Sequence, residues 1–528
     1  MLKKRIIGLF LLVSLLTGVL YGCGDTKKQD EPGSDENSSS REQTTGEAVY
    51  GGELIVGISQ DLGDSLDPYQ MTAAGTREVL FNVYEGLVKP DKDGNFIPAV
   101  AQSEPERSED GLRYTFALRE NVTFHNGAAV TASDVVKSFE TCAATTVDNA
   151  LAAALSAVES IEAGEDDSTI SITLSEPNGD FLSYVSSVYI TPADYADQAT
   201  APVGTGPLKF VSRSVQESVV LEKFEDYWGE GAYVDKVTLK IYEDPTALMS
   251  TISSGHLDMA IHLTQDQVST VNKEEYQVVE GAMNLVQALY LNHAEAPFDS
   301  TLVRQALCHA VDVDEILALT ADGHGTKIGT SIYPAFGKYF DESLVGLYEY
   351  DTEKAMELLA EAGYPNGFEM TISVPNNYAP HVNTAEVIVE QLSRVGIAAT
   401  LDLVEWETWL SDVYSNRDYN STIIGFDATS LTANALLSRW VSTDGKNMIN
   451  HDNPDYDAAM EKANAAVDET ERTEAFKEAA AILAETAANV YIQDMADFVV
   501  MRANLNGYAF YPMYVLDLAS IHYVDSAQ

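Results

Sequence analysis

Segments with the pattern of β-strands alternate with segments with the pattern of α-helices from Gly51 to the C-terminus, and no repeat of fixed length organises them. The stretch GGELIVGISQ, which begins at Gly51, has the composition of a strand. Helical patterns are clear at Thr301–Leu317, Asp351–Ala362 and Arg472–Ala487, and the segment 489–512 is again rich in strand-forming residues. This alternation predicts an α/β protein whose mixed sheets are flanked by helices.

The stretch RYTFALRENVTFHNGAAVTASDVVKSFE, residues 113–140, predicts a compact surface unit. Alternating apolar residues at its start indicate a half-buried strand, a second short strand follows, and Asn126-Gly127 is a strong turn signal. Thr131 precedes Asp134 by three residues, which is the spacing of a capping box at the start of a helix. The predicted helix has one apolar face, formed by Val135, Val136 and Phe139.

The charge of the chain makes nucleic acid an unexpected partner. Its 528 residues include 31 Lys and Arg against 82 Asp and Glu, a formal net charge of -51. A field of that sign repels phosphate backbones. With 45% apolar residues the chain can nevertheless fill the cores of roughly three domains, so the acidity is interpreted as a solvated surface.

The N-terminus has the pattern of an export signal followed by a lipid attachment site. Three basic residues precede an apolar run, Ile6–Leu20, which is shorter than the roughly 20 residues needed to cross a bilayer. The sequence Leu-Tyr-Gly-Cys, which ends at Cys23, resembles a bacterial lipobox. We therefore predict a signal peptide at 1–22 and lipidation of Cys23, followed by a polar, disordered tether that completes the segment 23–48. Ordinary signal cleavage beside an unrelated Cys is the alternative.

Sequence motifs of catalysis or of a resident metal are absent. The nine histidines lack the spacing of a zinc site, no GxSxG elbow occurs, and the stretch 204–207, Gly-Thr-Gly-Pro, is predicted as a turn that enters a strand. We expect no enzyme activity, no metal and no cofactor, although a metal site assembled from distant residues stays open. Cys142 and Cys308 are predicted to be free, buried thiols.

A series of segments in a fixed order closely resembles the extracytoplasmic solute-binding proteins of ABC importers, in the group that binds oligopeptides, dipeptides and nickel. The resemblance covers nearly everything from about Gly51 onward. The segments are NVYEGLV, DKDGNFIPAVAQS, YTFALRENVTFHNGAAVTASDVVKSF, GTGPLKF, FEDYWGEGAYVDKVTLKIYED, SGHLDMA, LNHAEAPFDSTLVRQALCHAVDVDEI and YDTEKAMELLAEAGYPNGF. In that family the FHNG unit belongs to a supporting part away from the ligand, so His125 is expected to fix a turn rather than to bind a ligand.

The resemblance implies a periplasmic-binding-protein-like fold with two lobes, often compared to a Venus flytrap, and an extra inserted domain. Lobe I would be discontinuous and take residues 51–86, 202–289 and 496–528. The inserted supporting domain would run over 87–201, and lobe III over 290–495.

In such a fold a solute is captured when the two lobes close around it, and it is then delivered to permease subunits in the membrane. Crossings near Tyr290-Leu291-Asn292 and Asp494-Met495 would be the hinges. In peptide-binding relatives the ligand lies extended and pairs with protein main chain. The loop Asp67–Gly75 corresponds in position to that surface, which predicts ligand contacts at Thr72, Ala73 and Ala74, with a plain polar loop as the alternative.

The predicted wall of the cleft in lobe III carries aromatic and acidic residues. Trp406 matches a Trp that lines the pocket of relatives, and Phe426 replaces another, with burial of both rings in the core as the alternative. Oligopeptide binders carry Gly-Trp-x-x-Asp here, whose carboxylate holds the peptide amino terminus. This chain has Thr429 at the acidic position, and Asp427 lies two residues earlier. Either Asp427 takes over that role, or it caps the turn or faces solvent.

The predicted function is therefore that of a lipid-anchored, extracytoplasmic binding component of an ABC importer on the bacterial cell membrane. It would be a monomer that takes a peptide or another small organic solute. A carrier of nickel chelates or oligosaccharides stays open, and an enzyme or adhesin on the same scaffold is a more distant alternative.

Substitution Cys23→Ser should abolish retention at the membrane, because the body of the chain has no segment of its own that could anchor it. The variant should be released or remain as an unprocessed precursor, and cell fractionation with immunoblotting measures both. Membrane association equal to that of the wild type would contradict the anchor.

Overall fold

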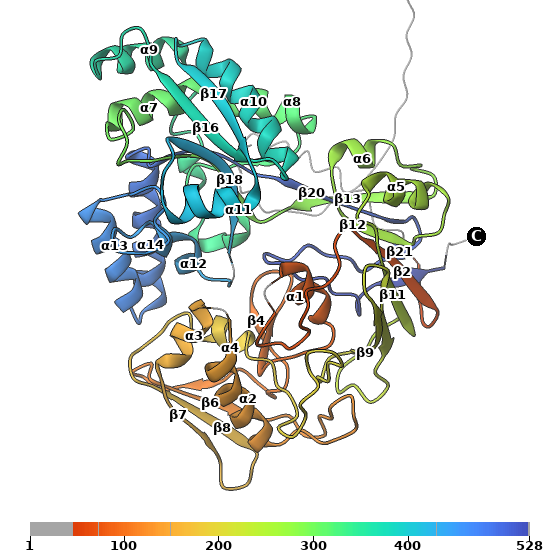
Figure 1. Cartoon of the computed structure of the whole chain (residues 1–528). Helices are drawn as coiled ribbons and strands as arrows, with labels where there is room; N and C mark the ends of the chain where they lie inside the picture. The colour runs from red at the N-terminus through yellow and green to blue at the C-terminus, as the bar shows by residue number, and fades with distance from the viewer. Residues whose placement is uncertain (1–45, 72, 148, 429, 526–528) are drawn as a thin grey trace, which may run out of the picture. The chain divides into compact units, whose positions relative to one another are not determined.

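Strands from distant parts of the chain form the largest sheet of this computed structural model (Figure 1). Its seven strands lie in the order β13-β20-β12-β2-β11-β10-β9, and the central β2 pairs in parallel with both β11 and β12. The strands are β2 (Glu53–Ile58), β9 (Leu208–Ser214), β10 (Ser218–Lys223), β11 (Lys236–Ile241), β12 (Met259–Leu263), β13 (Tyr276–Ala282) and β20 (Ala496–Arg502). Helices α1 (Ala74–Leu80), α5 (Pro245–Ser253) and α6 (Gln265–Ser269) lie between these strands in sequence.

The second sheet has six strands in the order β15-β19-β14-β18-β16-β17. They are β14 (Leu285–Leu291), β15 (Thr326–Lys327), β16 (Glu369–Pro375), β17 (Ala398–Val404), β18 (Ser421–Asp427) and β19 (Asn489–Asp494). The structure describes residues 46–71, 73–147, 149–428 and 430–525, all of which belong to one unit, Gln43–Gln528.

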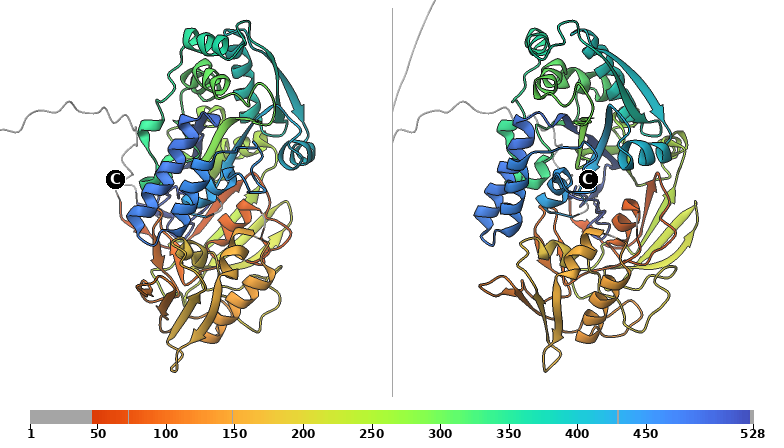
Figure 2. Two further views of the ribbon diagram at one scale, coloured as in Figure 1. Left: turned by 90° about the vertical axis from the view of Figure 1, so that its left-hand side faces the viewer. Right: turned by 60° about the vertical axis from the view of Figure 1, so that its left-hand side comes forward.

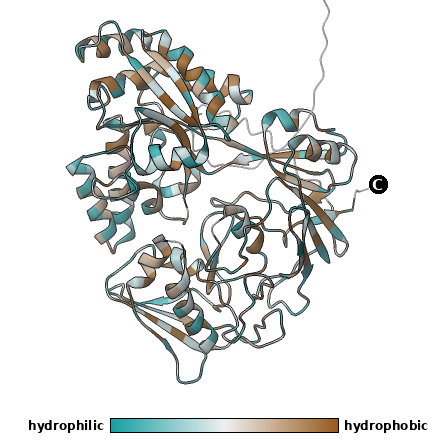
Figure 3. Ribbon diagram, viewed as in Figure 1, coloured by the Kyte–Doolittle hydropathy of each residue, from teal (hydrophilic) through white to brown (hydrophobic). Residues whose placement is uncertain are grey.

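Two hydrophobic cores contact this second sheet. One includes residues of α7 (Thr301–Ala310), α8 (Val313–Ala321), α9 (Thr352–Glu361) and α10 (Ala379–Ser393). The other includes residues of α12 (Ala433–Leu437), α13 (Pro454–Ala465) and α14 (Glu469–Glu485). Figure 2 shows α13 and α14, in blue, packed side by side, and Figure 3 shows hydrophobic residues along many of the strands.

A single antiparallel ribbon passes from one sheet into the other. The pairing of β13 with β20 ends at Ala282 and Ala496, and the pairing of β14 with β19 includes Gln287 and Gln493. Between them Met283 N–H donates to Met495 O at 2.8 Å, and Asn284 adopts a positive φ of 58°. The chain thus changes sheets at 283–284, so the crossing predicted at Tyr290–Asn292 is wrong, because Tyr290 lies inside β14.

A four-stranded sheet in the order β5-β6-β8-β7 contains the strand of the surface unit predicted over 113–140. The sheet comprises β5 (Glu106–Arg107), β6 (Arg113–Ala117), β7 (Val158–Ala163) and β8 (Thr169–Leu174), with the helices α2 (Ala132–Thr145), α3 (Asn149–Ser156) and α4 (Phe181–Ser186) nearby in sequence. The capping box is confirmed, because Thr131 Oγ1 accepts from Asp134 N and the Asp134 carboxylate accepts from Thr131 N. The second short strand is reduced to an isolated bridge between Thr123 and Ala129.

The prediction that His125 fixes a turn is confirmed. Its Nδ1 accepts from Gly204 N–H at 3.3 Å, so its Nε2–H donates to Gly206 O at 2.9 Å. Burial lowers the pKa of His125 to about 4, so the ring is neutral at ordinary pH. Both glycines are required, because a Cβ on Gly204 would lie 2.1 Å from Val83 O and one on Gly206 would lie 2.3 Å from Asn82 O.

Two small sheets contain the remaining strands of the described residues. They are a two-stranded sheet of β3 (Val88–Pro90) and β4 (Phe96–Pro98), and a three-stranded sheet of β1 (Ala48–Val49), β22 (His522–Val524) and β21 (Leu505–Asn506). Since Ala48 pairs with Val524, the last residue of the predicted tether belongs to the folded body. The signal peptide, Cys23 and the tether up to residue 45 lie outside the described residues.

Several predicted helix boundaries change. The helix predicted over 301–317 is two helices, α7 and α8, because Val311 is extended and the Asp312 side chain accepts from Glu315 N to cap a new helix. The last predicted helix, α14, begins at Glu469, three residues before Arg472, because Asp468 caps it. Cys142 and Cys308 are free and buried, as predicted.

Substitution Thr131→Ala should lower the free energy of unfolding by about 1 kcal/mol, because it leaves the amide of Asp134 without its side-chain acceptor. Thr131→Ser retains the hydroxyl and should cost much less. Urea denaturation of both variants measures the difference, and equal losses would show that the cap does not contribute.

Candidate functional site

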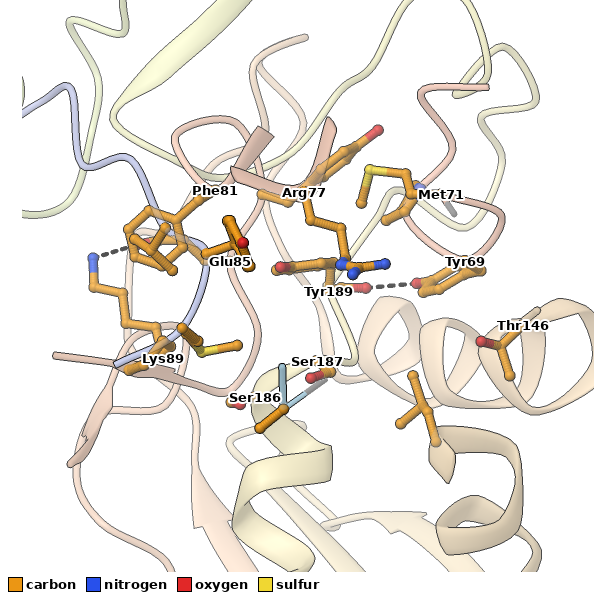
Figure 4. Close-up of a pocket in the computed structure, with 18 of the residues that line it drawn as sticks. Tyr69, Met71, Arg77, Phe81, Glu85, Lys89, Thr146, Ser186, Ser187 and Tyr189 are labelled. Carbon is orange, nitrogen blue, oxygen red and sulfur yellow. Dashed lines mark hydrogen bonds and ion pairs between the residues drawn. The ribbon is translucent and has the colours of Figure 1, made fainter. Parts of the chain in front are cut away.

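A small cavity gathers residues from five separate parts of the chain. Its volume is about 70 Å³. It is lined by Pro68, Tyr69, Met71, Arg77, Phe81, Tyr84, Glu85, Lys89, Pro90, Thr146, Leu151, Ser186, Ser187, Tyr189, Asp427, Ala428, Met513, Tyr514 and Val515. Figure 4 shows Arg77 beside Tyr189, whose carbonyl accepts from the hydroxyl of Tyr69. Asp427 and Ala428, at the end of β18, thus meet the predicted loop of residues 67–75.

Asp427 is the predicted site residue that the structure places in this cavity. Its side chain is half-buried, and no hydrogen bond or ion pair of its carboxylate occurs within the described ranges. From the loop, Pro68, Tyr69 and Met71 line the cavity instead of the predicted alanines.

The other predicted loop and turn residues do not line the cavity. Ala73 is exposed, and its carbonyl accepts from Thr76 N and Arg77 N at the start of α1. Ala74 is the first residue of α1. Thr72 and Thr429 lie outside the described residues.

Trp406 and Phe426 belong to one aromatic array. Trp406 stacks on Trp409 with ring centroids 5.2 Å apart and planes 6° apart. Trp409 stacks on Tyr414 at 5.9 Å, and Tyr414 lies 6.4 Å from Phe426. Trp406 and Phe426 are both half-buried, so the array is a partly exposed wall rather than a sealed core.

The array is held in place by one buried ring that the sequence reasoning missed. Trp409 is buried, and its Nε1–H donates to Thr422 Oγ1 at 2.9 Å. It opens a π-helical turn, Trp409–Ser415, that follows the short helix α11 (Trp406–Thr408). Turns of this type are frequent at functional sites. The spacing Trp-x-x-Trp is the signal that could have identified Trp409.

Glu85 fixes the polar side of the cavity. Its side chain is only 1% exposed, and it accepts from Lys89 Nζ at 2.9 Å, Tyr227 OH at 2.8 Å and Trp228 Nε1 at 2.9 Å. These donors compensate the buried charge, which would otherwise be costly. Lys89 also lines the cavity, and its hydrogen bond to Glu85 holds its ammonium group in place (Figure 4).

A protonated histidine lies between two carboxylates near the cavity. His262 Nδ1 lies 2.8 Å from Asp497 Oδ2, and Nε2 lies 3.0 Å from Glu78 Oε1. Loss of hydration alone would lower the pKa of His262, but the charge of Glu78 and the hydrogen bonds to both carboxylates raise it well above the ordinary value. Both ring nitrogens therefore donate, and His262 joins α1 to β12 and β20.

Asp494 lies where the ribbon crosses between the sheets. Its side chain is buried, and Oδ1 accepts from Leu285 N at 3.1 Å. This carboxyl group supplies a hydrogen-bond acceptor at the place where the pairing of β13 with β20 ends and the pairing of β14 with β19 begins. Burial raises the pKa of Asp494 to about 7, although the backbone amides of Leu285 and Asn284 lower it and the charge of Asp497 raises it further.

A buried ion pair joins two regions that line a second groove. The guanidinium of Arg472, on α14, contacts the carboxylate of Asp180, the residue directly before α4. Their side chains are 4% and 8% exposed. The groove beside them has a volume of about 650 Å³, and Leu431 is one of its lining residues.

Neither a metal site nor a membrane span is found in the described part of the chain. No group of three or more His, Cys, Asp or Glu side chains is placed to hold a metal ion in these residues. Over the same residues, none of the helices combines the length and the apolar character needed to cross a bilayer.

Comparison with known proteins yields a consistent set of similar sequences and structures. The sequence profile of the family described as "Bacterial extracellular solute-binding proteins, family 5 Middle" matches residues 95–448. Heme-binding protein A of Haemophilus influenzae is 29% identical over 467 residues, which cover 81% of this chain and 84% of that protein. The glutathione-binding protein GsiB of Pectobacterium atrosepticum is 29% identical over 439 residues, which cover 79% and 83%.

A solved structure has the same fold over nearly its whole length. It is the ABC transporter-associated periplasmic binding protein DppA of Helicobacter pylori in complex with the peptide STSA. The TM-score is 0.74 and the identity 27%, and the match covers 90% of this chain and 99% of that one.

Substitution Asp494→Asn should remove a pH dependence of stability. With a pKa of about 7 against an ordinary 3.8, the folded protein holds a proton that the unfolded chain releases, so wild-type stability falls as the pH rises from about 4 to 7. At about 1.4 kcal/mol for each pKa unit, the loss is roughly 4 kcal/mol. Asn keeps the acceptor for Leu285 N but cannot ionise.

The measurement is the free energy of unfolding of both proteins at pH 5 and pH 8. The variant should gain on the wild type as the pH rises. Asp418→Asn, at an exposed position, should leave the pH dependence unchanged. Parallel curves for Asp494→Asn and the wild type would contradict the assignment.

Proposed function

Because this chain belongs to family 5 of the bacterial extracellular solute-binding proteins, which serve ABC importers, we propose that it captures a peptide or a similar small organic solute. The captured solute would lie between the end of β18 and the loop of residues 67–75, and it would pass from there to permease subunits in the membrane.

The family and the fold class agree with the predictions from sequence. The α/β fold of periplasmic binding proteins is confirmed by the match to a solved member and by the several mixed sheets. The similar proteins named above are binding proteins rather than enzymes. The division into lobe I, inserted domain and lobe III remains a proposal, with its first crossing moved to residues 283–284.

One observation supports a ligand with an amino group. The Asp427 carboxylate borders the cavity, is half-buried, and has no hydrogen bond or ion pair to another described residue. A half-buried carboxylate gains most from a cationic donor, since charge-assisted hydrogen bonds are about twice as strong as neutral ones. A ligand ammonium group would supply that donor, and the mixed wall of Tyr69, Met71 and Tyr189 would contact the rest of the solute.

The small cavity implies that capture involves a change of conformation. Ligand sites usually measure about 300–1,000 Å³, whereas this cavity measures about 70 Å³. The solute would therefore enter a more open arrangement, with the ribbon at residues 283–284 and 495 as the flexible connection. Binding favours closure only through contacts that improve on closing.

Attachment to the membrane through Cys23 is part of the proposal. A lipidated Cys23 with a polar tether would keep the body at the outer surface of the cell membrane, within reach of its permease. No second function is proposed, because no observation favours a nickel chelate or an oligosaccharide over a solute with an amino group.

The test compares Asp427→Asn with the wild type, each titrated calorimetrically with short peptides and with the same peptides acetylated at the amino terminus. A charge-assisted contact contributes roughly 1.5–3 kcal/mol, so the substitution should weaken binding of free peptides about ten- to one-hundred-fold. Acetylation should weaken binding to the wild type by a similar factor and to the variant far less.

Asp402→Asn is the matched control, since it removes an exposed carboxylate from the same part of the chain. It should bind free peptides as the wild type does. Equal losses on acetylation in wild type and Asp427→Asn would remove Asp427 from the site. Absence of peptide binding by the wild type would contradict the peptide proposal.

A further inference from the structure

The groove of about 650 Å³ lies between two parts of the chain that share little else. One wall comes from the proposed inserted domain, residues 87–201, and the other from the proposed lobe III, residues 290–495. Among the described residues, no strand pairing and no hydrophobic core includes members of both parts. Side-chain contacts across the groove therefore decide how firmly the two parts hold together there.

One ion pair crosses this groove. The guanidinium of Arg472 contacts the carboxylate of Asp180, and both side chains are buried. No other ion pair joins the inserted domain to lobe III in the ranges that the structure describes. Because two buried charges have lost most of their hydration, each of them depends on the other for compensation.

Arg472 occupies an unfavourable position in its own helix. It lies only three residues after the start of α14, at the end of the helix where the dipole disfavours a cation. In the described part of lobe III, the carboxylate within ion-pair distance is that of Glu469, which lies 3.9 Å from Nη1 and also contacts Lys338. The ring of Phe476 attracts the charge from 5.1 Å but supplies no acceptor. The partner across the groove thus explains the position of Arg472 better than its own helix does.

Asp180 does not make the local hydrogen bond that is usual at its position. It stands directly before α4, where the carboxylate of an Asp commonly accepts from a helix amide. An Asp does so before each of the helices α5, α8, α9 and α14. The Asp180 carboxylate makes no such bond and contacts Arg472 instead.

Gly179 leaves the space in which the arginine side chain lies. A Cβ at this position would be 2.9 Å from Nε and 3.0 Å from Cδ of Arg472. The backbone itself does not require glycine here, because Gly179 is not among the residues with a positive φ. The missing side chain therefore serves the contact between Arg472 and Asp180.

We propose that Arg472 and Asp180 form a latch between lobe III and the inserted domain, which closes when the protein captures its solute and separates when the protein opens. Neither residue lines the small cavity. The two residues are positioning residues, because they set the affinity for the solute through the closed state and without touching the solute. This inference gives the inserted domain a part in capture, and it rests on the proposed function.

The energetics of a buried ion pair suit a contact that must also separate. The attraction between the two charges is largely offset by the hydration that they lose on closing. If one charge is removed, its former partner is uncompensated in the closed state but hydrated in the open state, so the open state is favoured. If both charges are replaced by apolar side chains, the cost of dehydration disappears and closure is restored.

The first test measures closure of the full-length protein without solute, after removal of any co-purified solute by unfolding and refolding. Amino acids with a ketone group are incorporated in place of Glu162, on β7, and Asn464, on α13, both of which are exposed, and they are coupled to spin labels. Pulsed electron paramagnetic resonance then gives the distance between the two parts. Arg472→Gln should shift the population toward longer distances, and the double variant Asp180→Leu with Arg472→Met should shift it back.

Two further variants make this result specific. Gly179→Ala keeps both charges but displaces the guanidinium of Arg472, so it should also lengthen the distance, and it serves as the test if Arg472→Gln does not fold. Arg394→Gln is the matched control, because Arg394 pairs with Glu315 at 2.7 Å inside lobe III, and it should leave the distance unchanged. Wild-type distances in Arg472→Gln and Gly179→Ala would overturn the latch, and so would a double variant as open as Arg472→Gln.

The second test measures affinity by calorimetry with a pool of di- to pentapeptides. The apparent affinity falls with the fraction of molecules that can close, so Arg472→Gln should bind the pool about ten-fold more weakly than the wild type. The double variant should bind as the wild type does. Equal affinities of the wild type and Arg472→Gln, together with different distances, would contradict the control of affinity by the latch.

The latch and the proposed function can fail separately, because the distances are measured without solute. If no peptide binds to the wild type but the distances change as expected, the proposed function fails and the latch stands. If peptides bind but the distances are the same in all variants, the proposed function stands and the latch is wrong.

Discussion

The ribbon that crosses between the two large sheets is the constraint on which the remaining structure depends. Strands β13 and β20 pair on one side, β14 and β19 on the other, and the ladder is interrupted between them. The hydrogen bond from Met283 to Met495 and the carboxyl group of Asp494 fill that interruption. Because β13 continues into β14 and β19 continues into β20, a bend at residues 283–284 and 495 changes the distance between β18 and the loop of residues 67–75.

The end of β18, which such a bend would move, carries two residues of the candidate site. Asp427 faces the small cavity, whereas Phe426 belongs to the aromatic array. Adjacent residues of one strand therefore lie in two different surroundings, the small cavity and the aromatic array.

The sequence was informative where local chemistry decides the structure. The capping box at Thr131, the turn at Asn126-Gly127 and the role of His125 depend on neighbouring residues and were predicted correctly. The break between α7 and α8 was missed, because the helical periodicity continues through Asp312 and conceals its capping role. Within the candidate site, the position of Asp427 in a pattern led to its prediction, but Trp409 was missed. Its hydrogen bond to Thr422 and its stacking on Trp406 depend on three-dimensional packing.

The size of the small cavity has a kinetic consequence. Under the proposed function, a volume of about 70 Å³ is too small for a peptide, so a solute molecule that meets this arrangement would leave without binding. The association rate would then be the encounter rate multiplied by the fraction of time the protein spends open. The buried pair of Arg472 and Asp180 joins regions on either side of a groove and is poorly screened by salt. If opening separates these two charges, changes in ionic strength will alter the first encounter of a charged solute far more than the lifetime of the closed state.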